Sequence, residues 1–160
     1  MRYLIDGYNL LFHEGEEFCS LQKEREKLVQ QLQAAFRSLH LQGTIVFDGS
    51  RRRDEESGRS YDNPLETVFA PRGQSADEYL LEQLDTVHNK KTITLVTNDK
   101  HLTRHARAVG AHTLTIRAFL SWVDKQFSTR KPTRRTPRES PQQMARLKQV
   151  FEDRLNNPEK

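Results

Sequence analysis

Short apolar runs alternate with longer segments of helical period over the first 127 residues of the chain. The runs are rich in β-branched and aromatic residues, which predicts strands over 2–6, 44–48, 66–70 and 92–97 and a short strand over 113–116. Between them, apolar residues recur every three or four positions, which predicts helices over about 20–40, 75–88, 100–109 and 117–127. This alternation predicts an α/β fold with a central parallel sheet of about four or five strands and helices on both faces.

Two segments depart from the alternation. Residues 50–64 are charged, contain glycine and lack an apolar period, so we expect a long loop there. After residue 128 the chain becomes basic and proline-containing, which predicts a folded domain over 1–128 and a linker over 129–141. An amphipathic helix is expected over 142–160, because apolar residues recur there at helical spacing. Those residues are Met144, Leu147, Val150, Phe151 and Leu155.

The positive charge of the chain lies in this C-terminal part. The 160 residues, enough for one domain with a full core, carry a formal net charge of +4. Residues 130–160 contain nine Lys or Arg and four Asp or Glu, a balance of +5 that leaves −1 for residues 1–129. The folded part is therefore nearly neutral, and the basic tail suits a polyanionic partner.

Cysteine content and hydropathy bear on location. Cys19 is the single cysteine of the sequence, which excludes an intrachain disulfide and favours a reducing, intracellular environment. The sequence shows no apolar stretch of about 18 residues and no signal-peptide pattern at its start, so we expect neither a membrane span nor export. These observations predict a cytoplasmic protein without membrane association.

Aspartates stand where the predicted strands end. Asp6 and Asp48 end the first two strands, Asp77 opens the helix after the third, and Asp99 follows the fourth. Because the carboxyl ends of parallel strands share one edge of a sheet, we expect the four carboxylates to lie near one another. Clustered carboxylates repel, so a shared site requires a cation. Oxygen-only ligands suit Mg²⁺ or Mn²⁺ better than zinc.

Each aspartate also has a purely structural interpretation. The Asp-Gly pairs at 6–7 and 48–49 are common turn dipeptides. The segment SADE at 75–78 has the pattern of a helix capping box, with Glu78 as its acidic partner, and Asp99 stands at an expected helix N-cap. We favour a shared acidic site, because four independent coincidences at one edge are a less economical explanation. Glu78 is interpreted as a capping residue.

Four segments of the chain resemble the YacP-like branch of the NYN domain, within the wider PIN-like nucleases. They read IDGYNLL, IVFDG, VFAPRGQSADEYLLEQL and LVTNDKHL, occur in the expected order, and lie within residues 2–127. The resemblance implies a PIN-like three-layer α/β/α fold and metal-dependent cleavage of RNA. By motif position it implies Asp6, Asp77 and Asp99 as catalytic residues. The metal ligands it implies are Asp6, Asn9, Asp48, Asp77 and Asp99.

One motif departs from the pattern of the relatives. The fourth often reads Thr-Ser-Asp, whereas here it is Thr97, Asn98 and Asp99. Asn98 keeps the capacity to form hydrogen bonds, so we expect activity to be retained.

The resemblance implies a Mg²⁺- or Mn²⁺-dependent endoribonuclease, since related YacP-like proteins are ribosome-associated endonucleases that act on mRNA. Hydrolysis of a phosphodiester needs an activated water and neutralisation of transition-state charge, and divalent cations held by carboxylates supply both. Asn9 adds a neutral oxygen without adding repulsion. The alternative is a non-catalytic RNA- or ribosome-binding adaptor with the same fold, which is less favoured because an adaptor gains nothing from repelling carboxylates.

Basic residues near the predicted edge and in the linker are candidates for contacts with RNA phosphates, which give affinity without sequence specificity. Near the edge they are Arg51, Arg52, Arg53, Arg72 and Lys100. In the linker they are Arg130, Lys131, Arg134 and Arg135. The three acids at 54–56 offset the preceding arginines, so a solvated charged loop is an equal alternative there. His101 and His105 have the spacing of zinc ligands but lack a third ligand, so we interpret them as surface residues.

Overall fold

The structure is a computed structural model that describes residues 1–13, 15, 17–49 and 58–129. It divides into two compact units, Met1–Ile116 and a second that begins at Arg117. The predicted linker, apart from its first residue, and the predicted terminal helix lie outside the described residues. The domain boundaries expected there stay predictions.

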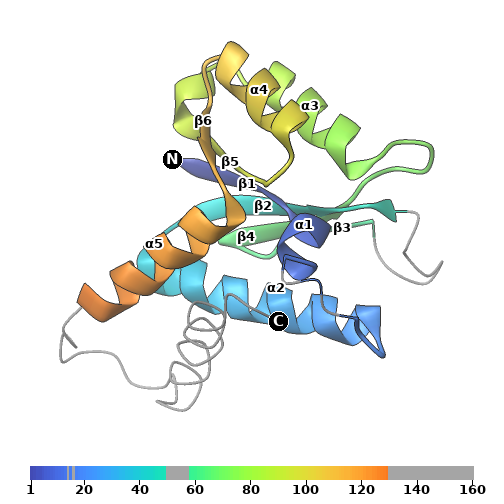
Figure 1. Ribbon diagram of the computed structural model, residues 1–160, viewed down its shortest axis with the longest axis vertical. Helices are drawn as coiled ribbons and strands as arrows, with labels where there is room; N and C mark the ends of the chain where they lie inside the picture. Colours follow the sequence, from blue (N-terminus) through green and yellow to red (C-terminus); the bar gives the residue numbers. More distant parts are fainter. Residues whose placement is uncertain (14, 16, 50–57, 130–160) are drawn as a thin grey trace. The chain divides into compact units, whose positions relative to one another are not determined.

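A six-stranded sheet forms the centre of the first unit, in the order β3-β4-β2-β1-β5-β6 (Figure 1). Five of its strands run parallel: β1 (Arg2–Asp6), β2 (Gln42–Phe47), β4 (Leu65–Phe69), β5 (Ile93–Val96) and β6 (His112–Leu114). The predicted α/β fold is confirmed, with one addition. The two-residue strand β3 (Arg59–Ser60) pairs antiparallel with β4, inside the segment expected to be a loop. Two residues are too few to show a strand period in the sequence.

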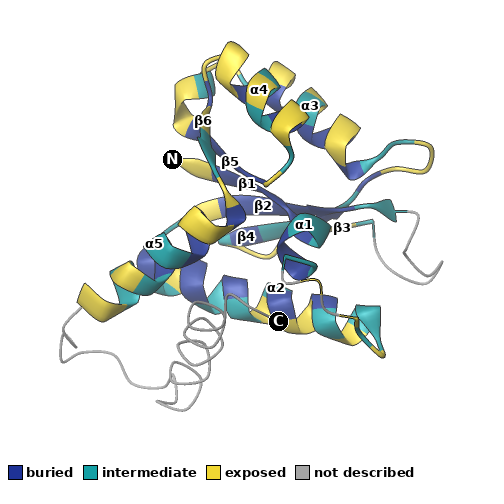
Figure 2. Ribbon diagram, viewed as in Figure 1, coloured by how far each residue is buried: buried dark blue, intermediate teal, exposed yellow. Residues whose placement is uncertain are grey.

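The central strands are buried on both sides, which explains why they read as continuous apolar runs. Every residue of β5 is buried, as are all but the first residues of β1 and β2 (Figure 2). The parallel register places Ile5 beside both Ile45 and Val96. The carboxyl ends of β1, β2 and β5 therefore meet at one edge.

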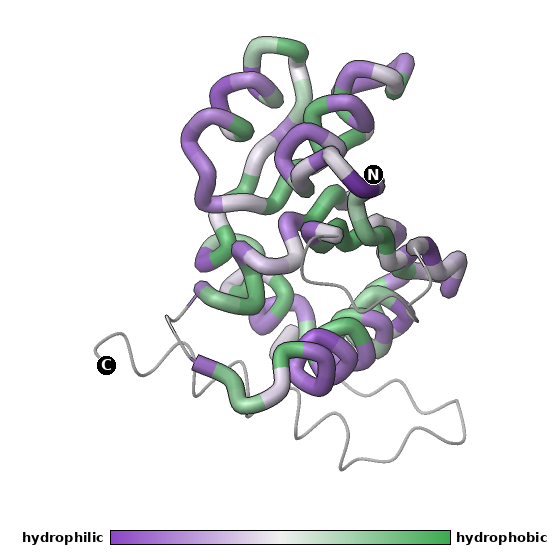
Figure 3. The backbone as a smooth tube through the Cα atoms, turned by 90° about the vertical axis from the view of Figure 1, so that its right-hand side faces the viewer, coloured by the Kyte–Doolittle hydropathy of each residue, from purple (hydrophilic) through white to green (hydrophobic). Residues whose placement is uncertain are grey.

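Helices cover both faces of the sheet, as the alternation predicts (Figure 1). One face carries α1 (Gly7–Leu11) and α2 (Leu21–Leu39), and the other carries α3 (Ala76–Thr86) and α4 (Lys100–Ala108). A 3-10 turn at Lys90–Thr92 leads into β5. Leu80, Leu84 and Leu102 join the sheet residues in one buried cluster. Figure 3 shows hydrophobic and hydrophilic positions alternating along the coiled segments, which is the pattern of helices with one buried face.

The short helix α1 was not expected, because the Asp-Gly pair at 6–7 indicated a turn. Instead Gly7 is already helical, and Asp6 caps the helix by accepting a hydrogen bond from the Asn9 backbone N–H at 3.3 Å. A Cβ at position 7 would stand 2.5 Å from a Phe47 ring carbon and 2.8 Å from the Val46 carbonyl oxygen. Only glycine permits this close approach to β2, and five residues are too short for a helical period to be visible.

Helix α5 (Ile116–Thr129) spans the start of the second unit. It buries Phe119, Leu120 and Val123, which occupy the apolar positions that predicted it. Within the described part of the chain, no helix combines the length and apolarity needed to cross a bilayer.

Candidate functional site

The predicted acidic residues lie at the carboxyl edge of the sheet. Asp6 is the last residue of β1, Asp48 directly follows β2, Asp77 is in the first turn of α3, and Asp99 precedes α4. An open pocket of about 220 Å³ brings Asp6, Asp48 and Asp77 together, with Tyr8, Phe12, Ser75 and Ala76 as its other walls. Asp99 does not line this pocket, but its charge acts on both Asp6 and Asp77.

Asp6 is the most buried of these carboxylates, with 7% of the residue exposed. It accepts hydrogen bonds from the Asn9 backbone N–H and from the Thr97 hydroxyl, each at 3.3 Å. Burial, followed by the charges of Asp77 and Asp99, nevertheless raises the pKa of Asp6 to about 6. Desolvation and like charge therefore outweigh two hydrogen bonds that favour the ionised form.

Asp77 stands beside the capping box of α3 without taking part in it. Ser75 and Glu78 form the box: the Ser75 N–H donates to Glu78 Oε2 at 2.8 Å, and the Glu78 N–H donates to Ser75 Oγ at 3.1 Å. The capping role predicted for Glu78 is thus confirmed. Partial desolvation and then the charges of Asp99 and Asp48 raise the pKa of Asp77, while His101 lowers it. Asp77 belongs electrostatically to the acidic edge, and Glu78 belongs to the helix end.

Asp99 caps α4, since its Oδ1 accepts a hydrogen bond from the Leu102 N–H at 2.8 Å. The Asp99 N–H in turn donates to Thr97 Oγ1 at 3.1 Å, and the Thr97 hydroxyl donates to Asp6. Thr97 therefore links the two aspartates through one buried side chain. Asp99 is thus the N-cap of α4, as its structural interpretation predicts, and it is also a neighbour of Asp6 at the acidic edge.

The two asparagines of the site hold neighbouring segments together. Asn9 Oδ1 accepts a hydrogen bond from the Asn98 N–H at 2.8 Å, and Asn98 Oδ1 accepts one from the Ile116 N–H at 3.0 Å. Asn9 thus fixes α1 to the connection after β5. The hydrogen-bonding capacity expected of Asn98 is used in positioning that connection.

Sequence reasoning missed Arg25, which lies buried beneath this edge with 4% of the residue exposed. Its Nη1 donates to the Tyr8 hydroxyl at 3.1 Å, and its guanidinium carbon lies 4.8 Å from the centre of the Phe69 ring. Tyr8 also stacks on Phe12, with ring centres 5.8 Å apart. A signal was present in the sequence, because Arg25 occupies the apolar stripe of α2 three residues before Leu28.

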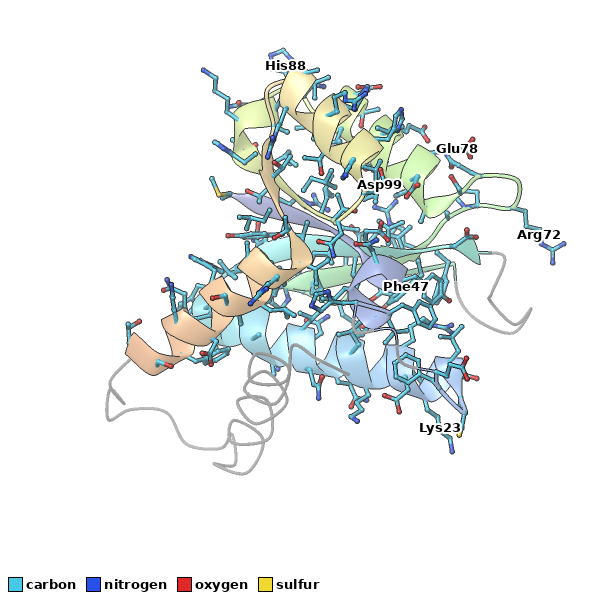
Figure 4. The ribbon with its side chains drawn as sticks, viewed as in Figure 1. Lys23, Phe47, Arg72, Glu78, His88 and Asp99 are labelled. Atoms are coloured by element: carbon cyan, nitrogen blue, oxygen red, sulfur yellow. The ribbon has the colours of Figure 1, made fainter. Side chains whose placement is uncertain are left out.

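Only two of the basic residues predicted to bind RNA lie within the described residues. Lys100 is exposed and is the first residue of α4, directly after Asp99. Arg72 is exposed on the loop before α3 and extends away from the fold (Figure 4). Arg51, Arg52 and Arg53 lie outside the described residues. The same holds for the linker residues Arg130, Lys131, Arg134 and Arg135.

The chemistry of the donor set fits a hard divalent cation, because all five predicted ligands offer oxygen. Their positions are less complete. Within the described residues, no three His, Cys, Asp or Glu side chains are grouped closely enough to hold one metal ion. Asp6 and Asp99 instead direct oxygens to the backbone N–H groups that they cap. These hydrogen bonds use Oδ1 of each carboxylate, so a cation at this edge would share the carboxylates with the capped N–H groups.

Comparison of the sequence with models of known protein families identifies the family to which this chain belongs. The model of the YacP-like NYN domain matches residues 3–160, nearly the whole chain. The protein therefore belongs to the YacP-like NYN family, and NYN domains are generally nucleases.

Solved structures with the same fold include two crystal structures of Rae1 (YacP) from Bacillus subtilis, one of them a mutant. The mutant structure has a TM-score of 0.61 and 19% identity, with 79% of each chain covered. The other has a TM-score of 0.60 and 16% identity, and covers 98% of this chain and 84% of its own. At these identities the likeness concerns the fold. A search of curated proteins found no match.

Proposed function

We propose that this protein is a Mg²⁺- or Mn²⁺-dependent endoribonuclease that cleaves mRNA in association with the ribosome. The observation that supports the proposal best is the electrostatic state of Asp6. This carboxylate is buried at a sheet edge where Asp77 and Asp99 both raise its pKa. An arrangement that destabilises its own charged form is expected where a cation and a phosphate are to be bound.

Each residue of the edge has a role in this proposal. Asp6, Asp48, Asp77 and Asp99, with Asn9 as a neutral donor, would hold the cation. When bound, the cation would activate a water and neutralise charge on the phosphate oxygens. Lys100, which is exposed and directly follows Asp99, would contact a neighbouring phosphate of the RNA. No general base is assigned to the protein.

A cleavage assay tests the proposal with a matched pair of neighbouring acids. Labelled single-stranded RNA and translating ribosomes are each incubated with the protein in Mg²⁺, Mn²⁺ or EDTA. We expect cleavage only with metal, and a loss of at least about 100-fold for Asp6→Asn and Asp77→Asn, since each removes transition-state charge stabilisation. Glu78→Gln is the control, because Glu78 serves the helix cap, and it should stay within about threefold of wild type. Cleavage by Asp6→Asn at the wild-type rate in Mn²⁺ would refute the site.

The adaptor function is the second candidate, and one observation favours it: the described acids form no ready group of three metal ligands. Thermal unfolding with Mn²⁺ separates the two. If a nuclease site binds Mn²⁺, a Mn²⁺ concentration of 100 times the Kd stabilises the folded protein by about 2.7 kcal/mol, which raises Tm by roughly 5–10 °C. The shift should disappear in Asp6→Asn. An adaptor should bind RNA in EDTA and show no such shift.

A further inference from the structure

A second open pocket lies at the opposite, amino edge of the sheet, and the proposed nuclease chemistry leaves it unused. Its volume is about 360 Å³, and its walls include Arg2, Gln42, Arg59, Tyr61, Asn63 and Glu66. Arg2 and Gln42 are the first residues of β1 and β2 and stand side by side in the sheet. Asp6 lies four residues further along β1, or about 13 Å at the rise of a strand. The two pockets are therefore separate sites.

One carboxylate organises two arginines in this pocket. Arg2 Nη2 lies 3.0 Å from Glu66 Oε2 and 2.8 Å from Thr44 Oγ1, and Arg59 Nε lies 2.5 Å from Glu66 Oε1. The Glu66 side chain is 12% exposed, whereas those of Arg2 and Arg59 are 51% and 44% exposed. The largely buried Glu66 carboxylate thus binds both guanidinium groups, while about half of each arginine side chain stays exposed to solvent. The cluster keeps one net positive charge.

Tyr61 gives the pocket an exposed aromatic surface. The residue is 74% exposed, and among the described large hydrophobic residues only Met1 is comparably exposed. The Arg59 guanidinium lies over its ring, 4.8 Å from the ring centre. A tyrosine ring beside positive charge and open to solvent has the features of a stacking platform for a nucleobase.

We propose that this amino-edge pocket binds one unpaired nucleotide of single-stranded RNA, with its base stacked on Tyr61 and its phosphate held by Arg2 and Arg59. The volume falls in the range of small-molecule sites, and Asn63 and Gln42 supply polar groups for the ribose or the base edge. An acidic peptide would use the arginines but not the exposed ring, so RNA accounts for more of the site. Binding here requires neither metal nor cleavage, and so goes beyond the proposed nuclease activity.

Fluorescence of 2-aminopurine in a short single-stranded RNA tests the stacking contact directly. The full chain is titrated in EDTA, where the base analogue should be quenched on binding. Tyr61→Ala should abolish that quenching and weaken Kd about 5- to 100-fold, the range for loss of one stacked base. Tyr61→Phe keeps the aromatic face and should stay within about twofold of wild type. A duplex containing the same analogue should give no quenching through Tyr61.

Salt dependence tests the phosphate contact. Arg2→Gln should reduce the slope of log K against log salt concentration by about 0.7, the value for one phosphate of a single strand. Arg104→Gln, a change of an exposed arginine on α4, is the control and should leave the slope unchanged. Circular dichroism and Tm identify any variant that fails to fold, and the change of salt slope in Arg2→Gln then carries the test.

Equal quenching by wild type and Tyr61→Ala would overturn the proposal. It would also be overturned if an acidic peptide displaced the RNA from wild type and from Tyr61→Ala with equal efficiency. The result is independent of the nuclease assignment. A protein that quenches the probe but never cleaves RNA refutes only the proposed nuclease function. A protein that cleaves RNA without a contribution from Tyr61 refutes only the amino-edge site.

Discussion

The two edges of the sheet surround their carboxylates with opposite charges. At the carboxyl edge acids face acids, and burial together with Asp77 and Asp99 raises the pKa of Asp6 to about 6. At the amino edge Glu66 is held between the guanidinium groups of Arg2 and Arg59. A carboxylate paired with two arginines favours the folded state. A carboxylate buried among other carboxylates opposes folding in its ionised form, and such sites are candidates for binding or catalysis.

The topology explains how the carboxyl edge tolerates its acids. Three helices begin there, each directly beside an aspartate: α1 after Asp6, α3 at Asp77, and α4 after Asp99. Backbone N–H groups at a helix start favour negative charge. This partial compensation holds the carboxylates in place without neutralising them, so a cation can still lower their energy further.

The largest expected effect that tests this contrast comes from Asp6→Asn in metal-free buffer. The folded-state pKa of about 6 lies above the ordinary value of 3.8, so the folded protein binds the proton more tightly than the unfolded chain. Ionised Asp6 therefore lowers stability as pH rises from about 4 to 6, by up to about 3 kcal/mol. Asparagine keeps the N-cap and removes the charge. We expect the variant to be more stable than wild type at pH 7, by up to that amount.

Urea unfolding in EDTA between pH 4 and 8 measures the effect. The difference between Asp6→Asn and wild type should be small near pH 4, where Asp6 is protonated in the folded protein, and should reach its full size above pH 6 to 7. A difference that is constant over this range would show that Asp6 is not the titrating group. Added Mn²⁺ should stabilise wild type and thereby narrow the gap at pH 7.

The carboxyl edge was the more predictable of the two from sequence. Asp6, Asp48 and Asp99 each follow an apolar strand run, and parallel strands bring such positions to one edge. The five parallel strands are found within two residues of their predicted limits. Helix α1 could not be predicted, because its five residues begin with glycine and show no period, and its placement depends on contact with Phe47.

The amino edge could not be predicted, because its residues come together only through strand pairing. Arg2 and Glu66 are 64 positions apart in sequence, and no motif links them. Arg59 joins them through β3, a strand too short to recognise. Arg25 is a related case: its position on an apolar stripe was visible, but its partner Tyr8 is fixed by tertiary packing. Local patterns report strand ends well and report side-chain networks across a sheet poorly.

A smaller effect with the opposite sign is expected from Glu66→Gln. The same change of carboxylate to amide now removes the shared partner of Arg2 and Arg59 and leaves two guanidinium groups near each other. Because both arginines are about half exposed, solvent screening limits the loss of stability to roughly 1 kcal/mol. Urea unfolding at pH 7 in low salt measures it, and high salt should reduce the effect.

Asp85→Asn is the control for Glu66→Gln. Asp85 pairs with His105 at 3.1 Å, with side-chain exposures of 58% and 35%. We expect a change within about 0.5 kcal/mol, the usual size for such surface pairs. A loss at Asp85 as large as that at Glu66 would show that the amino-edge cluster has no special stability.

The smallest expected effect compares two neighbours within the carboxyl edge itself. Asp77 is destabilised by desolvation and by Asp99, whereas Glu78 closes the capping box through the Ser75 N–H. In EDTA at pH 7, Asp77→Asn should therefore increase the free energy of unfolding by about 0.5 kcal/mol, and Glu78→Gln should decrease it by about the same amount. The Tm should rise slightly in the first variant and fall slightly in the second. Glutamine can still accept the Ser75 hydrogen bond, which keeps the second effect small. The signs matter more than the sizes, because adjacent acids on one helix turn share the same helix dipole. Only their different neighbours can give the two substitutions opposite effects on stability. If both substitutions changed the free energy of unfolding in the same direction, Asp77 would act only through the helix end and not through the acidic edge.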